Sequence, residues 1–278
     1  MTITEINDTE LFYTRIGSGT PFLVMHGGLG FDHSYFRPEL DLLGESIELI
    51  YYDHRGNGRS GRPPISSITF EQLADDAEEL RKVLGYDRIG VIGHSFGGFV
   101  ALKYAIKYPE NLSFLIPMNI YPAFDRTHTK AFVKGLQAKN PSPELMKTFN
   151  SPPARTIEEF RINYRILNYL YVYDYKSEIK KRFEKMFDKM ILNLELSAIT
   201  NKLITKFNVL SDLNKISTPT LVVGGSGDGI IPASQVQRLH NNIPNSDIHI
   251  FEKSGHYPFF EEPEAFIKVI LDWVNTVK

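Results

Sequence analysis

A serine lies in a turn-forming sequence that is typical of nucleophiles. The stretch Gly93-His94-Ser95-Phe96-Gly97-Gly98 reads G-x-S-x-G and directly follows the apolar run 89–92. In this pattern a strand delivers the serine to a sharp turn and a helix leaves it, so the hydroxyl stands above the sheet. The glycines on either side leave room for a strained serine backbone. We therefore expect Ser95 to be a nucleophile rather than a helix-capping serine in a glycine-rich turn.

A serine nucleophile needs a base and an acid, and two later segments offer them. Asp228 lies in a glycine-rich turn after the apolar run 221–223, and His256 lies on a loop after the alternating run 247–251. Loops that follow the strands of a parallel sheet meet at one edge of the sheet. The order serine, acid, histidine predicts that His256 takes the proton of Ser95 and that Asp228 orients the imidazole.

Each partner also has a purely structural interpretation. An aspartate between glycines commonly forms a turn, and a single histidine is more often a surface or core residue. Asp125 follows the apolar run 114–116 and is the main competitor for the role of the acid. We favour Asp228 because of its turn and because it precedes His256 in the chain. The side chain of His94, next to the serine, should point away from it.

Two backbone amides should complete the site by binding the oxyanion that acyl transfer creates. One is the amide of Phe96, directly after the serine, and the other is that of Gly28 in the loop His26-Gly27-Gly28-Leu29-Gly30. This loop follows the apolar run 21–25, and its glycines let the backbone approach a substrate carbonyl. Gly27 in the same loop is a candidate for contact with the substrate. Taken alone, the loop reads as an ordinary connection after a strand.

These segments together resemble the α/β-hydrolase superfamily. The resemblance spans nearly the whole chain and includes the loop 26–30, the stretch Asp53-His54-Arg55-Gly56-Asn57-Gly58-Arg59-Ser60, the elbow 93–98, the turn around Asp228, and Gly255-His256. Within the superfamily, H-G-G-x-G followed by D-x-R-G-x-G-x-S is most similar to the proline iminopeptidase-like branch. The chain departs from that branch at four positions. The branch usually has proline at the position of Leu29 and glutamine at that of His54. It usually has a smaller residue at the position of His94 and an aromatic such as tryptophan or tyrosine at that of Phe96.

Several other kinds of chemistry are excluded. Residues 56–61 match G-x-G-x-x-G, but Arg62-Pro63-Pro64 prevents a helix from beginning there, so we reject a dinucleotide site. The sequence has no cysteine and no H-E-x-x-H, which excludes a disulfide framework, a thiol nucleophile and the usual zinc motifs. We therefore expect no metal and no cofactor.

Composition narrows the partners and the location. The net charge of −2 gives no electrostatic basis for binding nucleic acid or an anionic membrane. The first residues lack the basic and apolar segments of a signal peptide, and no apolar run reaches the ~20 residues of a membrane span. We expect a cytoplasmic protein, with no membrane association, whose partner is a small-molecule acyl substrate. Its oligomeric state does not follow from the sequence.

Periodicity predicts an α/β fold. Strand patterns occur at 2–6, 10–15, 21–26, 47–53, 88–94, 112–118, 219–224 and 247–252, mostly separated by helices. This alternation predicts an eight-stranded, mostly parallel α/β-hydrolase sheet with helices on both faces and an antiparallel hairpin at its edge. A helix is expected at 69–84, capped by Thr69, and another from Pro263.

One interval interrupts this alternation. Residues 1–121 and 214–278 form the predicted core domain, and 122–213 form a helical cap inserted between predicted strands six and seven. Helical patterns in the cap occur near 129–139, 143–150, 156–173 and 177–207. Most aromatic residues of the cap should form its own small core. A few, with Tyr169 and Phe183 as candidates, should line the substrate pocket and set substrate choice.

Three functions agree with these observations. The leading hypothesis is a serine hydrolase that cleaves an ester, lactone or amide of a small molecule through an acyl-enzyme. The resemblance implies a second, a proline iminopeptidase-type aminopeptidase, which needs acidic cap residues for the substrate amine. Candidates for that role are Asp174, Glu178, Glu184 and Glu195. The third is a small-molecule receptor that retains the three site residues with little turnover.

Overall fold

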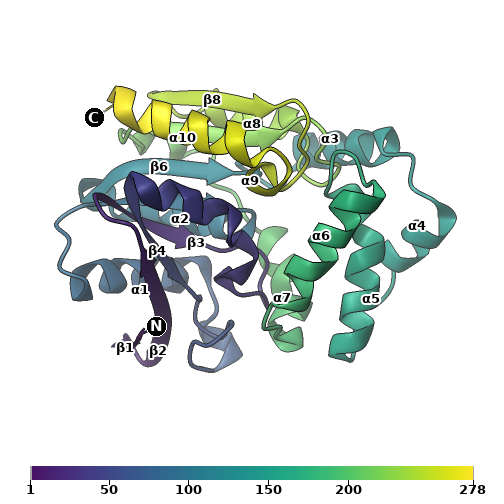
Figure 1. Ribbon diagram of the computed structural model, residues 1–278, viewed down its shortest axis with the longest axis horizontal. Helices are drawn as coiled ribbons and strands as arrows, with labels where there is room; N and C mark the ends of the chain where they lie inside the picture. Colours follow the sequence, from purple (N-terminus) through teal and green to yellow (C-terminus); the bar gives the residue numbers. More distant parts are fainter. Residues whose placement is uncertain (1, 278) are drawn as a thin grey trace.

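Eight strands form one sheet in the computed structural model, which describes residues 2–277 apart from the side chain of residue 177 (Figure 1). The strands are β1 (Thr2–Ile6), β2 (Thr9–Ile16), β3 (Thr20–Met25), β4 (Ile47–Tyr52), β5 (Ile89–His94), β6 (Leu112–Met118), β7 (Thr220–Gly225) and β8 (Ser246–Phe251). Their order across the sheet is β1-β2-β4-β3-β5-β6-β7-β8. The hairpin β1–β2 pairs antiparallel with β4, and all other pairs are parallel. The predicted fold class is confirmed.

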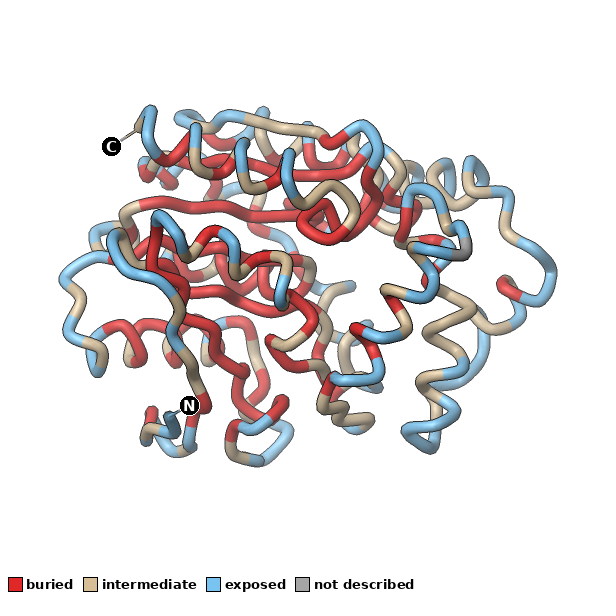
Figure 2. The backbone as a smooth tube through the Cα atoms, in the orientation of Figure 1, coloured by how far each residue is buried: buried red, intermediate tan, exposed pale blue. Residues whose placement is uncertain are grey.

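Helices cover both faces of the sheet. On one face lie α1 (Phe70–Val83), α2 (Phe96–Lys107) and α8 (Ala233–His240). On the other lie the 3-10 segments η1 (His33–Phe36) and η2 (Glu39–Glu45) with α9 (Pro258–Glu261) and α10 (Pro263–Val277). Strands buried on both faces read as continuous apolar runs, and every residue of β4, β5 and β7 is buried (Figure 2).

The sequence signals for two of these helices are seen in the structure. The side-chain oxygen of Thr69 accepts a hydrogen bond from the amide of Gln72 and so caps α1. The C-terminal helix begins at Pro263, as its sequence predicts. Three further 3-10 turns, η3 (Ile65–Ser67), η4 (Pro109–Asn111) and η6 (Leu213–Lys215), lie in the connections.

Between β6 and β7 the chain is helical. It forms α3 (Arg126–Ala138), α4 (Pro143–Phe149), α5 (Ile157–Leu167), the 3-10 turn η5 (Asn168–Leu170), α6 (Ser177–Asp188) and α7 (Leu194–Ile204). Helices α4 to α7 lie together at one end of the strands, on the right of Figure 1. An antiparallel bridge between Ala123 and Asn208 joins the two ends of this segment.

The helical patterns predicted at 156–173 and 177–207 were too long. The first helix ends at Leu167, and the second is divided into α6 and α7. The division falls before Asn193, whose side chain caps α7 and also donates a hydrogen bond to the carbonyl of Gly56, 2.9 Å away. The amide of Asn193 donates to the carbonyl of Gly30. Contacts to distant loops therefore override the local helical pattern.

Candidate active site

Ser95 occupies the turn between β5 and α2 in a backbone conformation that side-chain-bearing residues rarely adopt. Its φ is 52° and its ψ is −120°. The turn is possible because its neighbours are glycines. A Cβ at Gly97 would collide with the carbonyl oxygens of Met25 and His26, and one at Gly93 would lie 2.6 Å from the carbonyl oxygen of Gly97. The predicted elbow geometry is therefore present, with strain held by the packing of β3 against α2.

His256 and Asp228 meet at the same end of the sheet. The Nδ1 atom of His256 lies 2.6 Å from Oδ2 of Asp228, and both side chains are buried. The other carboxylate oxygen, Oδ1, accepts the amides of Ile230 and Ile231, at 2.9 and 2.8 Å. With its oxygens held in this way, the carboxylate fixes His256 in the orientation that leaves Nε2 as the free ring nitrogen.

Ser95 and His256 both line one cavity. Within the described part of the chain, neither the Ser95 hydroxyl nor the His256 Nε2 atom forms a hydrogen bond. The competitor Asp125 is engaged elsewhere. It caps α3 and pairs with Arg238 at 2.7 Å, which lowers the pKa of Asp125 to about 2. Asp228 is therefore the aspartate that the structure brings to His256.

His94 connects three segments of the site. Its Nδ1 lies 2.8 Å from the hydroxyl of Tyr35, which accepts the amide hydrogen of Gly27 at 2.6 Å. Its Nε2 lies 2.7 Å from the carbonyl oxygen of His256. Burial, with His256 close by, holds the pKa of His94 well below its usual value, so the ring is neutral and donates only through Nε2. This side chain ties the glycine loop to the histidine loop and does not pair with Ser95.

The amides of Gly28 and Phe96 have no acceptor among the residues that the structure describes. Phe96 is the first residue of α2, where amides lack a partner within the helix. Gly28 has a φ of 51°, and a Cβ there would collide with the ring of Phe31. Glycine is thus required at this position both for its backbone and for space, and two N–H groups remain available in residues that line the same cavity as Ser95.

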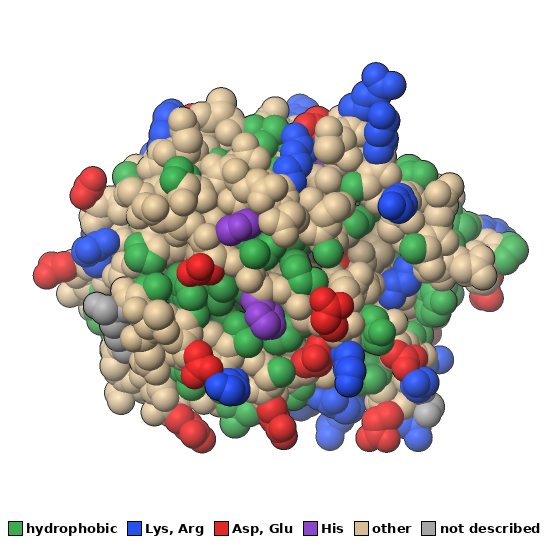
Figure 3. All heavy atoms as spheres, turned by 90° about the horizontal axis from the view of Figure 1, so that it is seen from above, with side chains coloured by type: hydrophobic (Ala, Val, Ile, Leu, Met, Phe, Trp, Pro, Cys, Tyr) green, Lys and Arg blue, Asp and Glu red, His purple; other side chains and the backbone are tan. Residues whose placement is uncertain are grey.

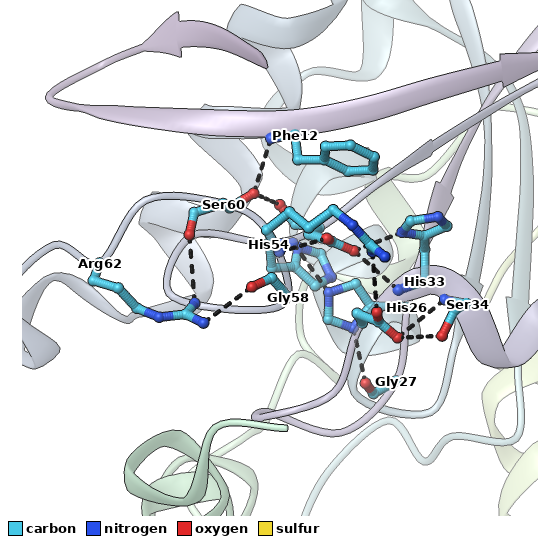
Figure 4. Close-up of polar contacts among 12 residues, drawn as sticks. Phe12, His26, Gly27, His33, Ser34, His54, Gly58, Ser60 and Arg62 are labelled. Atoms are coloured by element: carbon cyan, nitrogen blue, oxygen red, sulfur yellow. Dashed lines mark hydrogen bonds and ion pairs between the residues drawn. The ribbon is translucent and has the colours of Figure 1, made fainter. Parts of the chain in front are cut away.

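A buried polar network supports the glycine loop from below (Figure 4). The carboxylate of Asp53 binds Nδ1 of His33 at 2.7 Å and the amide of Arg59 at 2.8 Å. These contacts lower the pKa of Asp53 although burial opposes the shift. His54 donates its amide hydrogen to Nε2 of His26 at 3.0 Å. The loop after β4 therefore supports the loop after β3.

The same network accounts for the glycine-rich stretch 56–61. The hydroxyl of Ser60 accepts the amide hydrogen of Phe12 at 3.0 Å, and the guanidinium of Arg62 donates to the carbonyl of Gly58 (Figure 4). The same guanidinium also donates to the carbonyl of Gly56. A Cβ at Gly58 would collide with the carboxylate of Asp53. These glycines pack closely against the protein itself.

The cavity above Ser95 has a volume of about 690 Å³, and its walls are mostly apolar and rich in aromatic side chains. Its lining includes the glycine loop, the elbow, the His256 loop and residues of helices α3 to α7. Among its described lining residues there is no aspartate, glutamate, lysine or arginine. A site of this kind fits an uncharged molecule, because an ion here would lose its hydration without gaining a counter-ion.

Two of the three candidates for substrate contact line the cavity. Gly27 and Phe183 do, and Phe183 is fully buried. The prediction for Tyr169 is wrong. Its side chain is exposed outside the cavity, and its hydroxyl donates to the carbonyl of Lys139, because the chain turns at η5 and carries the ring outward. The four acidic residues considered for an amine site, Asp174, Glu178, Glu184 and Glu195, lie outside the cavity lining.

Sequence reasoning missed several residues that hold the site together. Asn119 donates to Oδ2 of Asp228 at 3.0 Å and to the carbonyl of Gly255 at 3.1 Å. It directly follows β6 and has a φ of 52°, which asparagine tolerates better than most residues. Its position after a strand was the available signal. Tyr35 in η1 carried no sequence signal, because its contribution is a hydrogen bond with His94, which lies in the distant strand β5.

Other kinds of site are not found among the described residues. No group of three histidine, aspartate or glutamate side chains in residues 2–277 could hold a metal ion. No described helix is long and apolar enough to cross a bilayer. On the face seen in Figure 3, acidic and basic side chains are interspersed.

Comparison with known proteins agrees with this geometry. The family described as the alpha/beta hydrolase fold matches residues 20–263. A proline iminopeptidase of Saccharolobus solfataricus is 30% identical over 280 residues, covering 98% of this chain and 90% of the relative. Among solved structures, a thermophilic esterase from Thermogutta terrifontis is 25% identical with a TM-score of 0.74, covering 100% of this chain and 99% of that one. An alpha/beta fold family hydrolase from Bacillus anthracis str. Sterne is 21% identical with a TM-score of 0.80, and the match covers 98% of each chain.

Proposed function

Because this chain belongs to the α/β-hydrolase superfamily, we propose that it is a serine hydrolase that cleaves an ester, lactone or amide of an uncharged small molecule. The observation that carries the proposal is the cavity itself. It brings together a strained serine, a histidine held by a buried aspartate, and two amides, and neither the serine hydroxyl nor the amides have a partner among the described residues. This combination is what acyl transfer through a covalent intermediate requires.

The proposed reaction has two halves. The Ser95 hydroxyl attacks the scissile carbonyl while Nε2 of His256 takes its proton, and Asp228 stabilises the resulting imidazolium. The carbonyl oxygen becomes an oxyanion bound by the amides of Gly28 and Phe96. His256 then gives the proton to the leaving group, which departs and leaves the acyl-enzyme. In the second half, water attacks the acyl-enzyme with His256 again as the base, and Ser95 is regenerated.

The second candidate is an aminopeptidase for N-terminal proline, which the 30% identical relative favours. Such an enzyme binds a protonated amine, and a buried ammonium needs a carboxylate partner. The described lining residues include no acid, and Asp228 is occupied by His256 and backbone amides. The cavity therefore supports uncharged esters and lactones over prolyl amides.

Turnover on a panel of p-nitrophenyl esters, lactones and prolyl amides tests the proposal. We expect esters or lactones to have the highest kcat/KM. The Ser95→Ala variant should lose ~10⁴–10⁶ of kcat, as in other triad enzymes. The matched control is Ser226→Ala, because Ser226 is exposed and outside the cavity lining.

Two results would contradict the proposal in different ways. The highest kcat/KM on a prolyl amide would support the aminopeptidase. Tight binding of the panel without turnover in the wild type would support a receptor. A fluorophosphonate label should attach at Ser95, and labelling that persists in Ser95→Ala would show that another residue is the nucleophile.

A further inference from the structure

Three tyrosines lie together in the wall of the cavity, and two of them contact the ring of His256. Tyr164 comes from α5, Tyr171 follows η5, and Tyr257 follows His256 directly. The ring of Tyr171 packs edge-on against the His256 ring with centroids 5.2 Å apart, and it lies 5.6 Å from the Tyr164 ring. Tyr171 and Tyr257 thus lie next to the histidine of the proposed reaction, and Tyr164 contacts both of them. We call the three residues the tyrosine trio.

The hydroxyl protons of the trio outnumber their acceptors in the protein. The hydroxyls of Tyr164 and Tyr257 lie 2.6 Å apart, so one proton serves that bond and the other has no acceptor among the described residues. The hydroxyl of Tyr171 forms no hydrogen bond within residues 2–277. By contrast, Tyr121 in the same cavity donates to the carbonyl of Ile204, and Tyr35 is bound to His94. Among the described tyrosines that line the cavity, unused hydroxyl donors are confined to the trio.

These hydroxyls keep their protons at neutral pH. Burial raises the pKa of Tyr171 to about 12, with the Asp228 charge adding to the effect. Burial also raises the pKa of Tyr164 and of Tyr257 well above the usual value of 10. The trio therefore presents neutral O–H donors, which prefer an uncharged acceptor in a cavity without ions.

We propose that the tyrosine trio binds a second carbonyl oxygen of the substrate, distinct from the carbonyl that Ser95 attacks. This inference rests on the proposed hydrolase function and names its substrate class, an acyl compound with a keto, ester or amide oxygen a few bonds from the scissile bond. An alkyl group beside the trio leaves buried hydroxyls unpaired, whereas a carbonyl oxygen accepts their protons. Sites built to bind a polar group reject analogues that lack it.

The position of the trio limits the distance between the two carbonyls. Tyr257 is the chain neighbour of His256, and Tyr171 also touches the histidine loop, since its carbonyl accepts the His256 amide at 2.5 Å. The donors therefore lie beside the reacting atoms and not at the far end of the cavity. A carbonyl a few bonds from the scissile one suits this arrangement.

Matched esters test the inference. Two pairs of p-nitrophenyl esters are compared, 4-oxopentanoate with pentanoate and 5-oxohexanoate with hexanoate. In each pair the measured quantity is kcat/KM of the keto ester divided by kcat/KM of the alkyl ester, called the keto-to-alkyl ratio. We expect the ratio to fall about tenfold in Tyr164→Phe and Tyr257→Phe, as expected for loss of one hydrogen bond. The intrinsic reactivity of each ester cancels between variants. In the control Tyr121→Phe, the ratio should equal that of the wild type, because this hydroxyl is already paired with Ile204.

A third variant guards against failure to fold. Tyr171→Phe removes a hydroxyl with no described protein partner and keeps the ring, so it should fold like the wild type and also lower the ratio. The inference would be overturned if, for both ester pairs, Tyr171→Phe and Tyr257→Phe had the same keto-to-alkyl ratio of kcat/KM as the wild type.

Binding separates this inference from the proposed function. In the Ser95→Ala background, calorimetry should show that the keto ester binds about tenfold more tightly than the alkyl ester, and that adding Tyr257→Phe removes the difference. If the wild type hydrolyses no ester, lactone or amide, the hydrolase proposal fails, while this binding difference still decides the role of the trio. Equal Kd values for the keto ester and the alkyl ester in Ser95→Ala would overturn the inference about the trio.

Discussion

At the scale of single residues, the site depends on how each polar atom is already used. Asp228 accepts two backbone amides through Oδ1 and binds Asn119 and His256 through Oδ2. Asp125 has its own set of partners on α3 and α8, among them Arg238. The two aspartates are similar in sequence context, since both follow apolar strands, but only Asp228 has an oxygen directed at the histidine.

This difference predicts unequal effects of removing the two charges. Asp228→Asn should lower kcat by on the order of 10³–10⁴, because the amide no longer holds the productive tautomer of His256. Asp125→Asn should keep near wild-type kcat and lose about 1 kcal/mol of stability with its Arg238 pair. Steady-state kinetics and urea unfolding of both variants check this. A severe loss of kcat in Asp125→Asn alone would transfer the role of the acid to Asp125.

At the scale of elements, the cap is held to the core through the break between α6 and α7. Asn193 caps α7 by accepting the amides of Glu195 and Leu196, and its amide group donates to Gly56 in the loop after β4. The backbone of Asn193 contacts Gly30 in the glycine loop. One residue therefore ends a helical pattern, begins a helix and joins the cap to the loops below it.

Replacing Asn193 by alanine should therefore cost more than the loss of an ordinary cap. We expect a decrease of about 2 kcal/mol in the free energy of unfolding, at the upper end for helix caps. Ser142→Ala is the matched control, because Ser142 caps α4 through the amide of Leu145 alone, and it should cost about 1 kcal/mol. Urea unfolding measures both. Equal losses would mean that the contact with Gly56 adds no stability.

At the scale of the whole molecule, stability should depend on pH through His128, which lies in α3 and packs against the segment that follows β6. His128 on α3 packs on Tyr121 with ring centroids 3.9 Å apart, and its Nδ1 is buried without a partner among the described residues. Burial lowers the pKa of His128 from 6.5 to about 4, although the nearby Asp125 charge opposes this. Between these two values the unfolded chain binds a proton that the folded protein does not.

Stability should consequently fall as the pH decreases from 6.5 to 4. The full contribution of neutral His128 is present above the unfolded pKa, and about 3 kcal/mol is lost by the time the folded pKa is reached. In His128→Phe, which keeps an aromatic ring beside Tyr121, this loss should be absent. Urea unfolding at several pH values gives the difference between the two proteins, in which other titrating groups cancel. Parallel pH profiles for both proteins would show that His128 is not the cause.

Much of the core was determined by the sequence alone, because local sterics and apolar periodicity act within a few residues. The eight strands, the cap of α1 by Thr69 and the start of α10 at Pro263 follow from such patterns. The turn at Ser95 also follows from the sequence, because Gly93 and Gly97 leave the space that the turn needs and a side chain at either position would collide with the backbone. The chain order of Ser95, Asp228 and His256 was enough to propose that they meet, because parallel strands end at one edge.

Only the tertiary structure decided which side chains face the cavity. Tyr169 and Tyr171 are two residues apart, yet one is outside and the other packs on His256, because the end of α5 and the turn at η5 set their directions. The division of 177–207 into two helices depends on contacts of Asn193 with Gly30 and Gly56. The tyrosine trio and the link from Tyr35 through His94 join residues from distant segments. Such contacts are set by the packing of whole elements, which no local pattern records.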